Sequence, residues 1–433
     1  MKIRFYNARI LTMKDGEELF EGELIVEDSK IKCIRRKASA KEDGQSGKNE
    51  ESYDREIDCE GNVLMPGFKN AHTHAGMTAM RSYADDLPLQ KWLTEKIFPL
   101  EAKMSGEDCY MFTKLAVLEF LTSGITAVWD MYLSPYDIAR CATDTGMKIV
   151  QVSGINKFGP SLEEMEQRYL KINGVSPLSS FRMGFHAEYT CSLELLEQIT
   201  ELAHKYKQPL WTHNSETRKE VDECIEKYGK TPTELFESLG MFEYGGGGYH
   251  CVYLSDNDIE IFKRRGLIVV TNPGSNTKLA SGIAPVQKFL DAGIPVAIGT
   301  DGPSSNNCLD MFREMFLVTG LAKLSTENAS AVDGLEVLKM ATVNGAKAMG
   351  LSDADILAEG KEADIIMIDL HQPNMQPLLN IEKNIVYSGS KQNVKLTMIH
   401  GKILYEDGRF FIGEEPEEIY RKSNEIIKRL TRS

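Results

Sequence analysis

The sequence lacks the features of a membrane, secreted or nucleic-acid-binding protein. No apolar stretch is long enough to cross a bilayer, and the N-terminal segment has no continuous apolar core followed by a small-residue cleavage site. No Lys/Arg-rich run is present, and the net charge is −14, which argues against a basic nucleic-acid-binding face. The eight cysteines are scattered, with no C-x-x-C pair, as is typical of reduced thiols. We therefore expect a cytoplasmic protein that binds neither nucleic acid nor membrane.

The middle of the chain alternates short apolar runs with amphipathic helical segments such as Leu193–Lys205, Asn257–Arg265 and Leu335–Met349. Alternation of this kind predicts parallel strands joined by helical crossovers. Eight repeats favour a closed (β/α)₈ TIM barrel, an α/β fold, over an open doubly wound sheet. The eight runs are Val63–His74, Ile125–Tyr132, Lys148–Gly154, Arg182–Tyr189, Pro209–Glu216, Tyr249–Leu254, Leu267–Pro273 and Pro295–Asp301.

Both ends of the chain show a different pattern, of short strands separated by turns. Strands are predicted at Lys2–Leu11, Glu23–Glu27, Ile31–Arg35, Ala363–Leu370, Asn384–Tyr387, Val394–Ile399 and Lys402–Tyr405, with a final helix at Pro416–Arg432. The 433 residues are enough for a barrel of about 250 residues and a smaller domain. We predict one small β-sandwich domain built from residues 1–65 and 359–433, with the barrel at 66–358. The polar segment Lys37–Arg55 is predicted to be a loop.

Histidine is scarce, with eight residues in the whole chain, yet several lie where predicted barrel strands end. His72 and His74 close the first run, and residues two apart on a strand point to the same side. Two imidazoles at that spacing suit zinc or a similar metal. Alone, an H-x-H pair is also compatible with a purely structural role. The metal-site interpretation therefore depends on whether other strand ends carry ligand residues.

Further polar residues follow other predicted strands. His213 closes the fifth run, His250 lies at the sixth and Asp301 closes the eighth. A carboxylate after an apolar strand is costly to bury unless it is paired or bound to a metal. Three imidazoles and one carboxylate, from His72, His74, His213 and Asp301, would hold one divalent ion and leave room for water. Zinc is favoured by the ligand type, although Fe²⁺ or Mn²⁺ fits the same set.

A proton carrier for hydrolysis is also present. Glu216 lies three residues after His213 and could reach a substrate from the same loop, or could simply be a solvated residue at a helix N-terminus. Asp301 could pass a proton from water to the leaving group, and His250 could orient the nucleophile. His204, His371 and His400 do not fall at strand ends and are predicted to be surface or packing residues.

At these residues the chain resembles the amidohydrolase superfamily, and within it the 5-methylthioadenosine/S-adenosylhomocysteine deaminases and related chlorohydrolase-like enzymes. The resemblance covers nearly the whole chain. The matching stretches are MPGFKNAHTHAGMTAMRSYADDLPLQKWL (65–93), WTHNSETRKE (211–220), HCVYLSD (250–256), NPGSNTKLASGIAPV (272–286), GTDGPSSNNCLDMF (299–312), VNGAKAMGL (343–351) and EGKEADIIMIDL (359–370).

The resemblance implies roles for individual residues. His72, His74, His213 and Asp301 match the ligands of a single metal, because the fourth strand offers no bridging lysine. Glu216 matches the proton shuttle to the substrate ring, and His250 matches an active-site histidine. Trp92, Glu101 and His186 match positions that contact the nucleoside.

The function implied is hydrolytic deamination of an amino-purine, an adenosine derivative such as 5-methylthioadenosine, S-adenosylhomocysteine or adenosine, by a homodimer or homotetramer. The alternatives are a free-base deaminase (guanine, cytosine or a modified purine), a triazine-type chlorohydrolase, or a non-catalytic metal-binding relative. Family members often carry arginines after the third strand that help to hold the substrate, and residues 152–160 contain none, although Lys157 could substitute. This departure argues against the homocysteine-bearing substrate. The run Gly245–Gly248 is expected to loosen the loop before the sixth strand.

Overall fold

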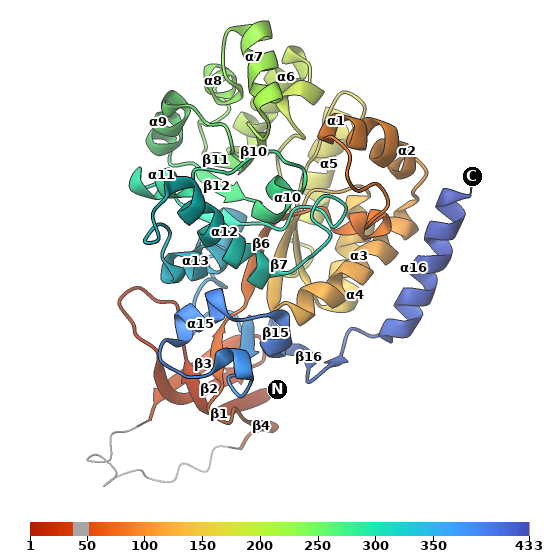
Figure 1. The fold of residues 1–433 in the computed structure, drawn as a ribbon. Coiled ribbons are helices and arrows are strands. Elements are labelled where there is room, and N and C mark those ends of the chain that lie inside the picture. The colour runs from red at the N-terminus through yellow and green to blue at the C-terminus, as the bar shows by residue number, and fades with distance from the viewer. Residues whose placement is uncertain (38–51, 433) are drawn as a thin grey trace.

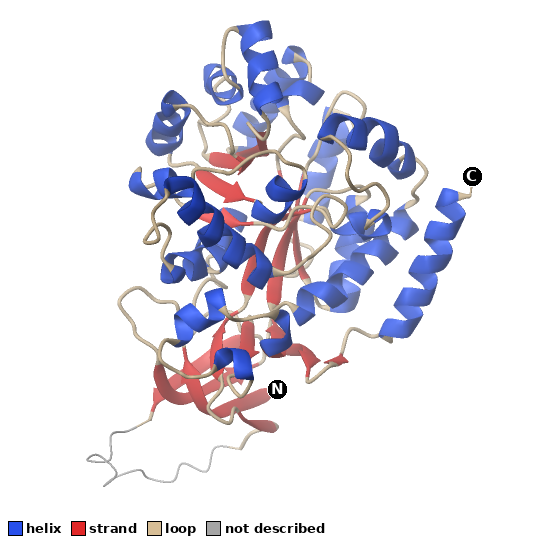
Figure 2. Ribbon diagram, in the orientation of Figure 1, coloured by secondary structure: helices blue, strands red, loops and turns tan. Residues whose placement is uncertain are grey.

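The middle of the chain forms two parallel four-stranded sheets surrounded by helices (Figures 1 and 2). The computed structural model describes residues 1–37 and 52–432, so most of the loop predicted at 37–55 lies outside the described residues. Each of the eight predicted runs overlaps a strand. One sheet contains β6 (Phe68–Thr73), β7 (Ile125–Asp130), β8 (Lys148–Val152) and β9 (Ser179–Arg182), and the other contains β10 (Leu210–Asn214), β11 (Gly246–His250), β12 (Ile268–Thr271) and β13 (Val296–Ile298).

The helices between these strands begin at polar caps. Ser161, Thr217 and Ser255, for example, each accept a hydrogen bond from the third residue of the helix that follows, which satisfies a backbone N–H that the helix itself leaves free. The helices are α3 (Gly106–Thr122), α4 (Pro135–Thr145), α5 (Leu162–Ile172), α6 (Leu193–Tyr206), α7 (Arg218–Tyr228), α8 (Pro232–Ser238), α9 (Asp256–Arg265), α10 (Pro273–Lys278), α11 (Val286–Asp291), α12 (Met311–Thr326), α13 (Gly334–Ala341) and α14 (Val343–Met349). Within the described residues, no helix is long and apolar enough to cross a membrane.

Strands from both ends of the chain share one mixed sheet, at the lower end of the molecule in Figure 1. β5 joins the two ends, because it pairs in parallel with β1 and antiparallel with β14. The sheet has its own apolar core, which includes Phe5, Leu24, Leu64, Ile365 and Met398. Its strands are β1 (Lys2–Ile10), β2 (Phe20–Glu27), β3 (Lys30–Arg36), β4 (Arg55–Asp58), β5 (Val63–Pro66), β14 (Ile365–Ile368), β15 (Val394–Ile399), β16 (Lys402–Glu406) and β17 (Arg409–Phe410).

Several predicted elements are corrected by the structure. The run Val63–His74 is two strands, β5 and β6, which separate at Gly67; a Cβ there would lie 2.0 Å from the side chain of Thr126. The predicted strand Asn384–Tyr387 belongs to a helix, α15 (Ile381–Tyr387), whose N-cap is Asn380. The predicted helix Leu335–Met349 is interrupted at Thr342, between α13 and α14.

The C-terminal helix α16 (Pro416–Thr431) lies along α3 and not on the terminal sheet (Figure 1). Arg429 of α16 pairs with Asp108 of α3 at 2.5 Å, and Glu414, two residues before α16, pairs with Lys114 of α3 at 2.6 Å. Near its end, Leu430 packs in an apolar cluster with Trp92, Leu93 and Ile97. Trp92, Leu93 and Ile97 lie in η2 (Trp92–Ile97), the middle of a helical segment that begins with α1 (Leu89–Lys91) and ends with α2 (Phe98–Glu101). Four further short turns are η1 (Ala75–Met80), η3 (Glu188–Thr190), η4 (Pro373–Met375) and η5 (Lys391–Asn393).

A buried ion-pair cluster ties β8 to the residues that precede β14. Lys148 Nζ lies 2.5 Å from Glu362 Oε2 and 2.5 Å from Asp364 Oδ2, and the side chains of Lys148 and Asp364 are 2% and 0% exposed. The backbone N–H of His400 also donates to Asp364. Lys148 is the nearest cation to both carboxylates in the described chain, and His400 Nδ1 lies 3.6 Å from Glu362 as a second partner.

Replacing Lys148 by alanine should lower the free energy of unfolding by about 3–5 kcal/mol, because a buried carboxylate would lose its cation. The matched control is Lys395→Ala, which breaks the more exposed pair with Glu60 and should cost no more than about 1 kcal/mol. Urea unfolding of the two variants checks this prediction. Equal losses would show that the buried cluster does not stabilise the junction.

Candidate metal centre and substrate cavity

The first two histidines lie at the end of β6. His72 lies on the strand and is fully buried. His74 is the first residue after the strand and is 8% exposed. The ring of His72 stacks on Tyr249 of β11 at a centroid distance of 3.9 Å, which fixes its orientation. Because the alternation of the strand turns both side chains to one side, their rings lie 4.9 Å apart.

Three more strand ends supply the other polar side chains. His213 lies on β10, His250 ends β11 and Asp301 follows β13. His250 and Asp301 have φ values of +69° and +58°, a left-handed conformation that non-glycine residues adopt at some cost and that often marks functional sites. Backbone hydrogen bonds bring these ends together: Asp301 N–H donates to His72 O at 3.0 Å, and His213 N–H donates to His186 O at 3.1 Å.

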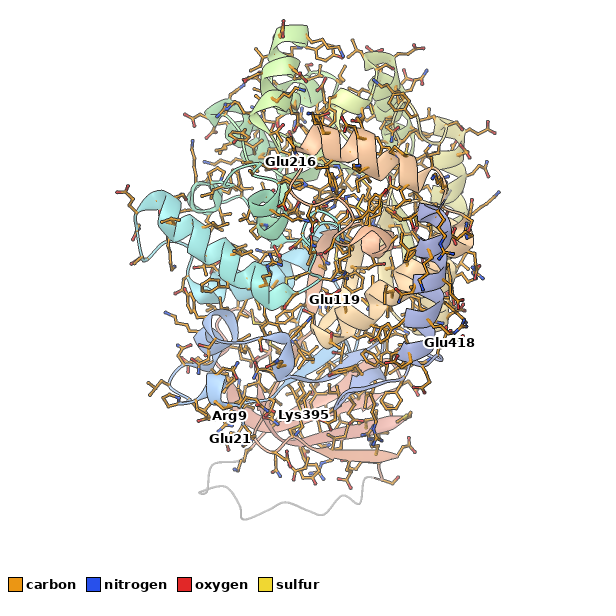
Figure 3. All side chains as sticks on the ribbon, turned by 45° about the vertical axis from the view of Figure 1, so that its right-hand side comes forward. Arg9, Glu21, Glu119, Glu216, Lys395 and Glu418 are labelled. Atoms are coloured by element: carbon orange, nitrogen blue, oxygen red, sulfur yellow. The ribbon has the colours of Figure 1, made fainter. Side chains whose placement is uncertain are left out.

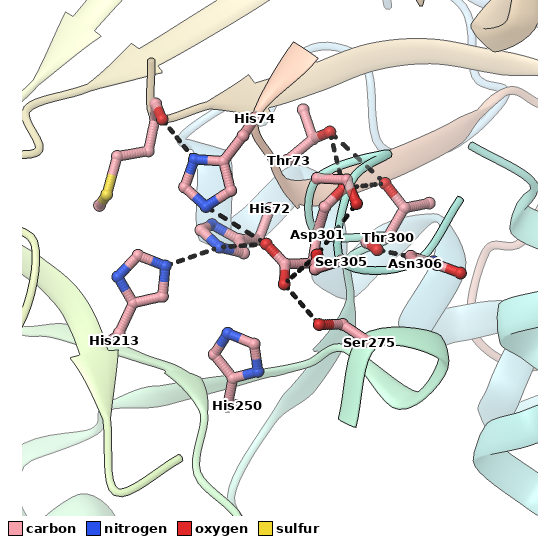
Figure 4. A network of polar contacts seen from close by, with 12 residues as sticks. His72, Thr73, His74, His213, His250, Ser275, Thr300, Asp301, Ser305 and Asn306 are labelled. Atoms are coloured by element: carbon pink, nitrogen blue, oxygen red, sulfur yellow. Dashed lines mark hydrogen bonds and ion pairs between the residues drawn. The ribbon is translucent and has the colours of Figure 1, made fainter. Parts of the chain in front are cut away.

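The donor atoms of these five side chains converge (Figure 4). His72 Nε2 lies 3.1 Å from His213 Nε2 and 3.6 Å from Asp301 Oδ1, and His74 Nε2 lies 3.2 Å from the same oxygen. One ligand atom from each of His72, His213, His250 and Asp301 lies within 4.8 Å of the other three. This group of four contains His250 in place of the predicted ligand His74, whose Nε2 contacts Asp301 from the side.

The hydrogen bonds behind the donors test whether a metal ion fits. The Nδ1 atoms of His74 and His213 face the carbonyl oxygens of Met131 and His186, so each of these Nδ1–H groups donates outward and directs the Nε2 atom of its ring toward the centre. Asp301 is held in a similar way. Its Oδ2 accepts from Ser275 and Ser305 at 2.6 and 2.8 Å, which leaves Oδ1 free to face the histidines.

The electrostatics agree with a cation at this point. Burial holds the pKa values of His72 and His213 well below the usual range, so both rings are neutral. Burial opposes ionisation of Asp301, but the hydrogen bond from His74 and the neighbouring histidines outweigh it and hold the pKa of Asp301 well below its usual range. Burial alone would lower the pKa of His74, but its hydrogen bond to Asp301 outweighs burial and raises that pKa to about 9. A divalent metal requires neutral imidazoles and an ionised carboxylate, so it would take the place of the proton between His74 and Asp301. The cluster therefore fits a metal ion.

A cavity of about 190 Å³ opens beside the cluster and is lined by His74, His213, His250 and Asp301. Glu216 lines the same cavity, is 6% exposed and accepts a hydrogen bond from Ser281 Oγ at 3.1 Å. Burial raises its pKa, which favours the protonated form. In Figure 3 Glu216 lies in the upper half of the molecule, far from Arg9 and Lys395 of the terminal sheet.

The residues expected to contact a nucleoside line this cavity too. Trp92 and Glu101 come from the helical segment that packs on α16, and His186 follows β9. Burial raises the pKa of Glu101 to about 7. Burial also lowers the pKa of His186 to about 4, and its Nδ1 lies 3.1 Å from Thr190 Oγ1. All the predicted site residues line this cavity except His72, which is fully buried within the cluster.

Arg168 is a cavity residue that the sequence analysis missed. It lines the cavity from α5, beyond the segment 152–160 in which an arginine was sought, and no carboxylate of the described chain lies within ion-pair distance of it. A signal was present, since Arg168 follows Met165 by three residues and precedes Ile172 by four, which places a cation on the buried face of an amphipathic helix.

Two local features support the centre in ways that the sequence did not reveal. Asn276 Oδ1 lies 2.8 Å from His250 Nδ1 and orients that ring. The glycines expected to loosen a loop instead form most of β11, between β10 and β12. A Cβ on Gly246 would lie 2.0 Å from Leu210 O, and one on Gly247 would lie 2.0 Å from Ile268 O. Glycine therefore permits the strands to approach closely here.

The three remaining histidines lie outside this cavity, as predicted. His204 Nε2 contacts Gly240 O, His371 Nε2 contacts Glu60 O, and His400 Nδ1 lies 3.6 Å from Glu362.

Comparison with known proteins gives matches along the whole chain. The model of the amidohydrolase family matches residues 63–404. A 5-methylthioadenosine/S-adenosylhomocysteine deaminase of Desulforamulus reducens is 40% identical over 92% of each chain, and a 5'-deoxyadenosine deaminase of Methanosarcina acetivorans is 39% identical over 98% of each. Among solved structures, a zinc-bound adenosine deaminase from Xanthomonas campestris is 28% identical with a TM-score of 0.92, covering 100% of this chain and 98% of its own.

Proposed function

The chain belongs to the amidohydrolase family, and from this premise we propose that it deaminates an adenosine derivative such as 5-methylthioadenosine, S-adenosylhomocysteine or adenosine. It is a hydrolase that acts on the C–N bonds of cyclic amidines. The observation that carries the proposal is the shared cavity of the His/Asp cluster and the buried Glu216. Water and the amino-purine would give the inosine analogue and ammonia.

One zinc ion is the proposed cofactor, held by His72, His74, His213 and Asp301. The histidine-rich donor set and the zinc-bound relative support zinc, while Fe²⁺ or Mn²⁺ would fit the same donors. Residues 183–190, after β9, contain no lysine that could bridge two ions. When bound, such a metal activates water as a nucleophile at neutral pH.

The residues around the cluster would move the protons. Protonated Glu216 would donate to the ring nitrogen next to the carbon that bears the amine, which makes that carbon more electrophilic. Asp301 would accept a proton from the attacking water and deliver it to the departing amine, so that ammonia leaves as the C–N bond breaks. His250, oriented by Asn276, would direct the water.

The far side of the cavity would bind the sugar and its 5' substituent. Glu101 could accept hydrogen bonds from ribose hydroxyls, Trp92 offers an apolar wall, and the ring of His186 lies 4.9 Å from that of His213. Arg168 adds a cation to this cavity, and a guanidinium suits a carboxylate. Its presence supports the homocysteine-bearing substrate that the absence of arginine at 152–160 argued against.

Two features of the structure support the architecture proposed from the sequence, one for the barrel and one for the terminal domain. We infer a closed barrel over residues 66–358, because hydrogen bonds link β9 to β10 (Phe185 N–H to Trp211 O) and β13 to β6 (Asp301 N–H to His72 O). The separate apolar core of the terminal sheet supports a small β-domain of residues 1–65 and 359–433, although its strands form one sheet and α16 packs on α3. The homo-oligomeric state and the cytoplasmic location stay predictions.

Metal-loaded protein incubated with 5-methylthioadenosine, S-adenosylhomocysteine, adenosine, adenine, guanine and cytosine should release ammonia from the nucleosides, and much less from the free bases, because Glu101 and Trp92 lie where a ribose would bind. A coupled ammonia assay with ultraviolet spectra of the products measures this. Turnover of free bases or of a chlorinated triazine alone, or of none of these compounds, would contradict the proposal.

Arg168→Gln should raise the KM for S-adenosylhomocysteine about tenfold or more, the effect of losing one charge-assisted hydrogen bond, and should leave that for 5-methylthioadenosine nearly unchanged. Arg140→Gln is the matched control, because Arg140 pairs with Glu107 and Asp137 outside the cavity. Steady-state kinetics with both substrates provide the comparison. An equal effect on both KM values would show that Arg168 does not recognise the carboxylate.

A further inference from the structure

The turn between β10 and α7 carries Glu216 and depends on a second buried carboxylate, Glu220. At Ser215 the backbone enters the left-handed region, with φ of +52°. The N–H groups of Ser215, Glu216 and Thr217 all point toward one side chain. Glu220 Oε1 accepts from Ser215 N at 2.8 Å, and Oε2 accepts from Glu216 N at 2.8 Å and Thr217 N at 3.4 Å.

Glu220 does more than cap its helix. The α-helical capping boxes at α3, α5, α8 and α9 also have a carboxylate that accepts from the N-cap N–H, at distances of 2.8–3.0 Å. Only at α7, among these helices of the described chain, does that carboxylate also bind the two residues before the N-cap. One of them is Glu216, the proposed proton carrier.

Burying the carboxyl groups of Glu216 and Glu220 close together, without a cation, is energetically unfavourable. Glu220 is 4% exposed and Glu216 is 6% exposed, and within the described residues neither lies in ion-pair distance of a lysine or arginine. Burial and the nearby Glu216 raise the pKa of Glu220 to about 7. A buried carboxyl group with no cation is stabilised here by backbone N–H donors alone, so those hydrogen bonds hold the turn tightly.

The backbone of Glu216 is held by Glu220 and its carboxyl by Ser281, which donates to Oε1. The side chain is therefore restrained at both ends where it lines the cavity. We propose that Glu220 is a positioning residue for the deamination, acting through the backbone of Glu216 to aim that carboxyl at the substrate ring. This inference rests on the proposed function of Glu216 as the proton carrier.

Glu220→Gln tests the inference, because the amide nitrogen of glutamine cannot accept from a backbone N–H. The kcat for the preferred nucleoside should fall about 10- to 100-fold, as expected for a displaced acid–base group, while KM should change less than about threefold. Metal content by elemental analysis should stay at the wild-type value. An unchanged kcat, or a loss of kcat that parallels a loss of metal, would overturn the positioning role.

Glu234→Gln is the matched control. Glu234 caps α8 in the same manner, accepting from Thr231 N at 3.0 Å, but it does not line the cavity. This variant should keep the wild-type kcat, and it should lower the thermal unfolding midpoint no more than Glu220→Gln does, because Glu234 accepts fewer backbone hydrogen bonds. A similar fall in kcat for both variants would mean that capping in general, and not Glu220, sets the rate.

A double variant separates positioning from other effects. In a Glu216→Gln background, Glu220→Gln should lower kcat by no more than about twofold further, because residues that act as one unit are not additive. Independent losses that multiply would overturn the inference. If Glu220→Gln does not fold, Glu220→Asp, which keeps both oxygens on a shorter side chain, should show the same selective loss of kcat, and a wild-type kcat would contradict the proposal. A wild-type protein that deaminates no amino-purine would overturn the proposed function itself.

Discussion

The close approach of histidine nitrogens and one carboxylate oxygen is the constraint on which the rest of the site depends. His72 Nε2 and His213 Nε2 lie 3.1 Å apart, and two imidazole nitrogens at this distance share at most one proton. Hydrogen bonds to Met131 O and His186 O turn the Nε2 atoms of His74 and His213 inward. Such a buried cluster is unfavourable unless a cation satisfies several donors together.

The register and spacing of the parallel strands bring these side chains together. Polar residues at the ends of β6, β10, β11 and β13 meet only because the strands are in register and closely spaced, and the glycines of β11 allow that spacing. The left-handed backbone at His250 and Asp301 then turns the side chains. Conformational cost at these positions is offset by the bonds that the side chains form at the centre.

The residues that the sequence singled out at strand ends lie together in the structure because the signals that marked them are local. An H-x-H pair on one strand, His213 at a strand end and Asp301 at another follow from alternation and from the position of strand ends. Arg168 was missed because it lies on a helix, where only its place on the buried face marks it. Three supporting residues were missed because they contact only other site residues. Asn276 contacts the ring of His250, and Ser275 and Ser305 donate to the carboxylate of Asp301.

Errors in the predicted elements have similar physical origins. Asn384–Tyr387 is too short to distinguish a strand from a helix, and Asn380, the cap that begins α15, lies outside that run. The glycines of β11 have low strand propensity, and only close contact with Leu210 and Ile268 explains them. Tertiary packing, which no local pattern encodes, decided the second case, whereas the first depended on a local cap just outside the run.

The central claim is that the histidine–aspartate cluster binds the one metal ion that hydrolysis of the C–N bond requires. Its most direct test is a titration of metal-free protein with Zn²⁺, in which bound zinc and the rate of ammonia release from an adenosine derivative are measured on the same samples. The account predicts that both rise together and saturate at one zinc per chain. Full activity without metal, or activity that requires a second equivalent, would contradict it.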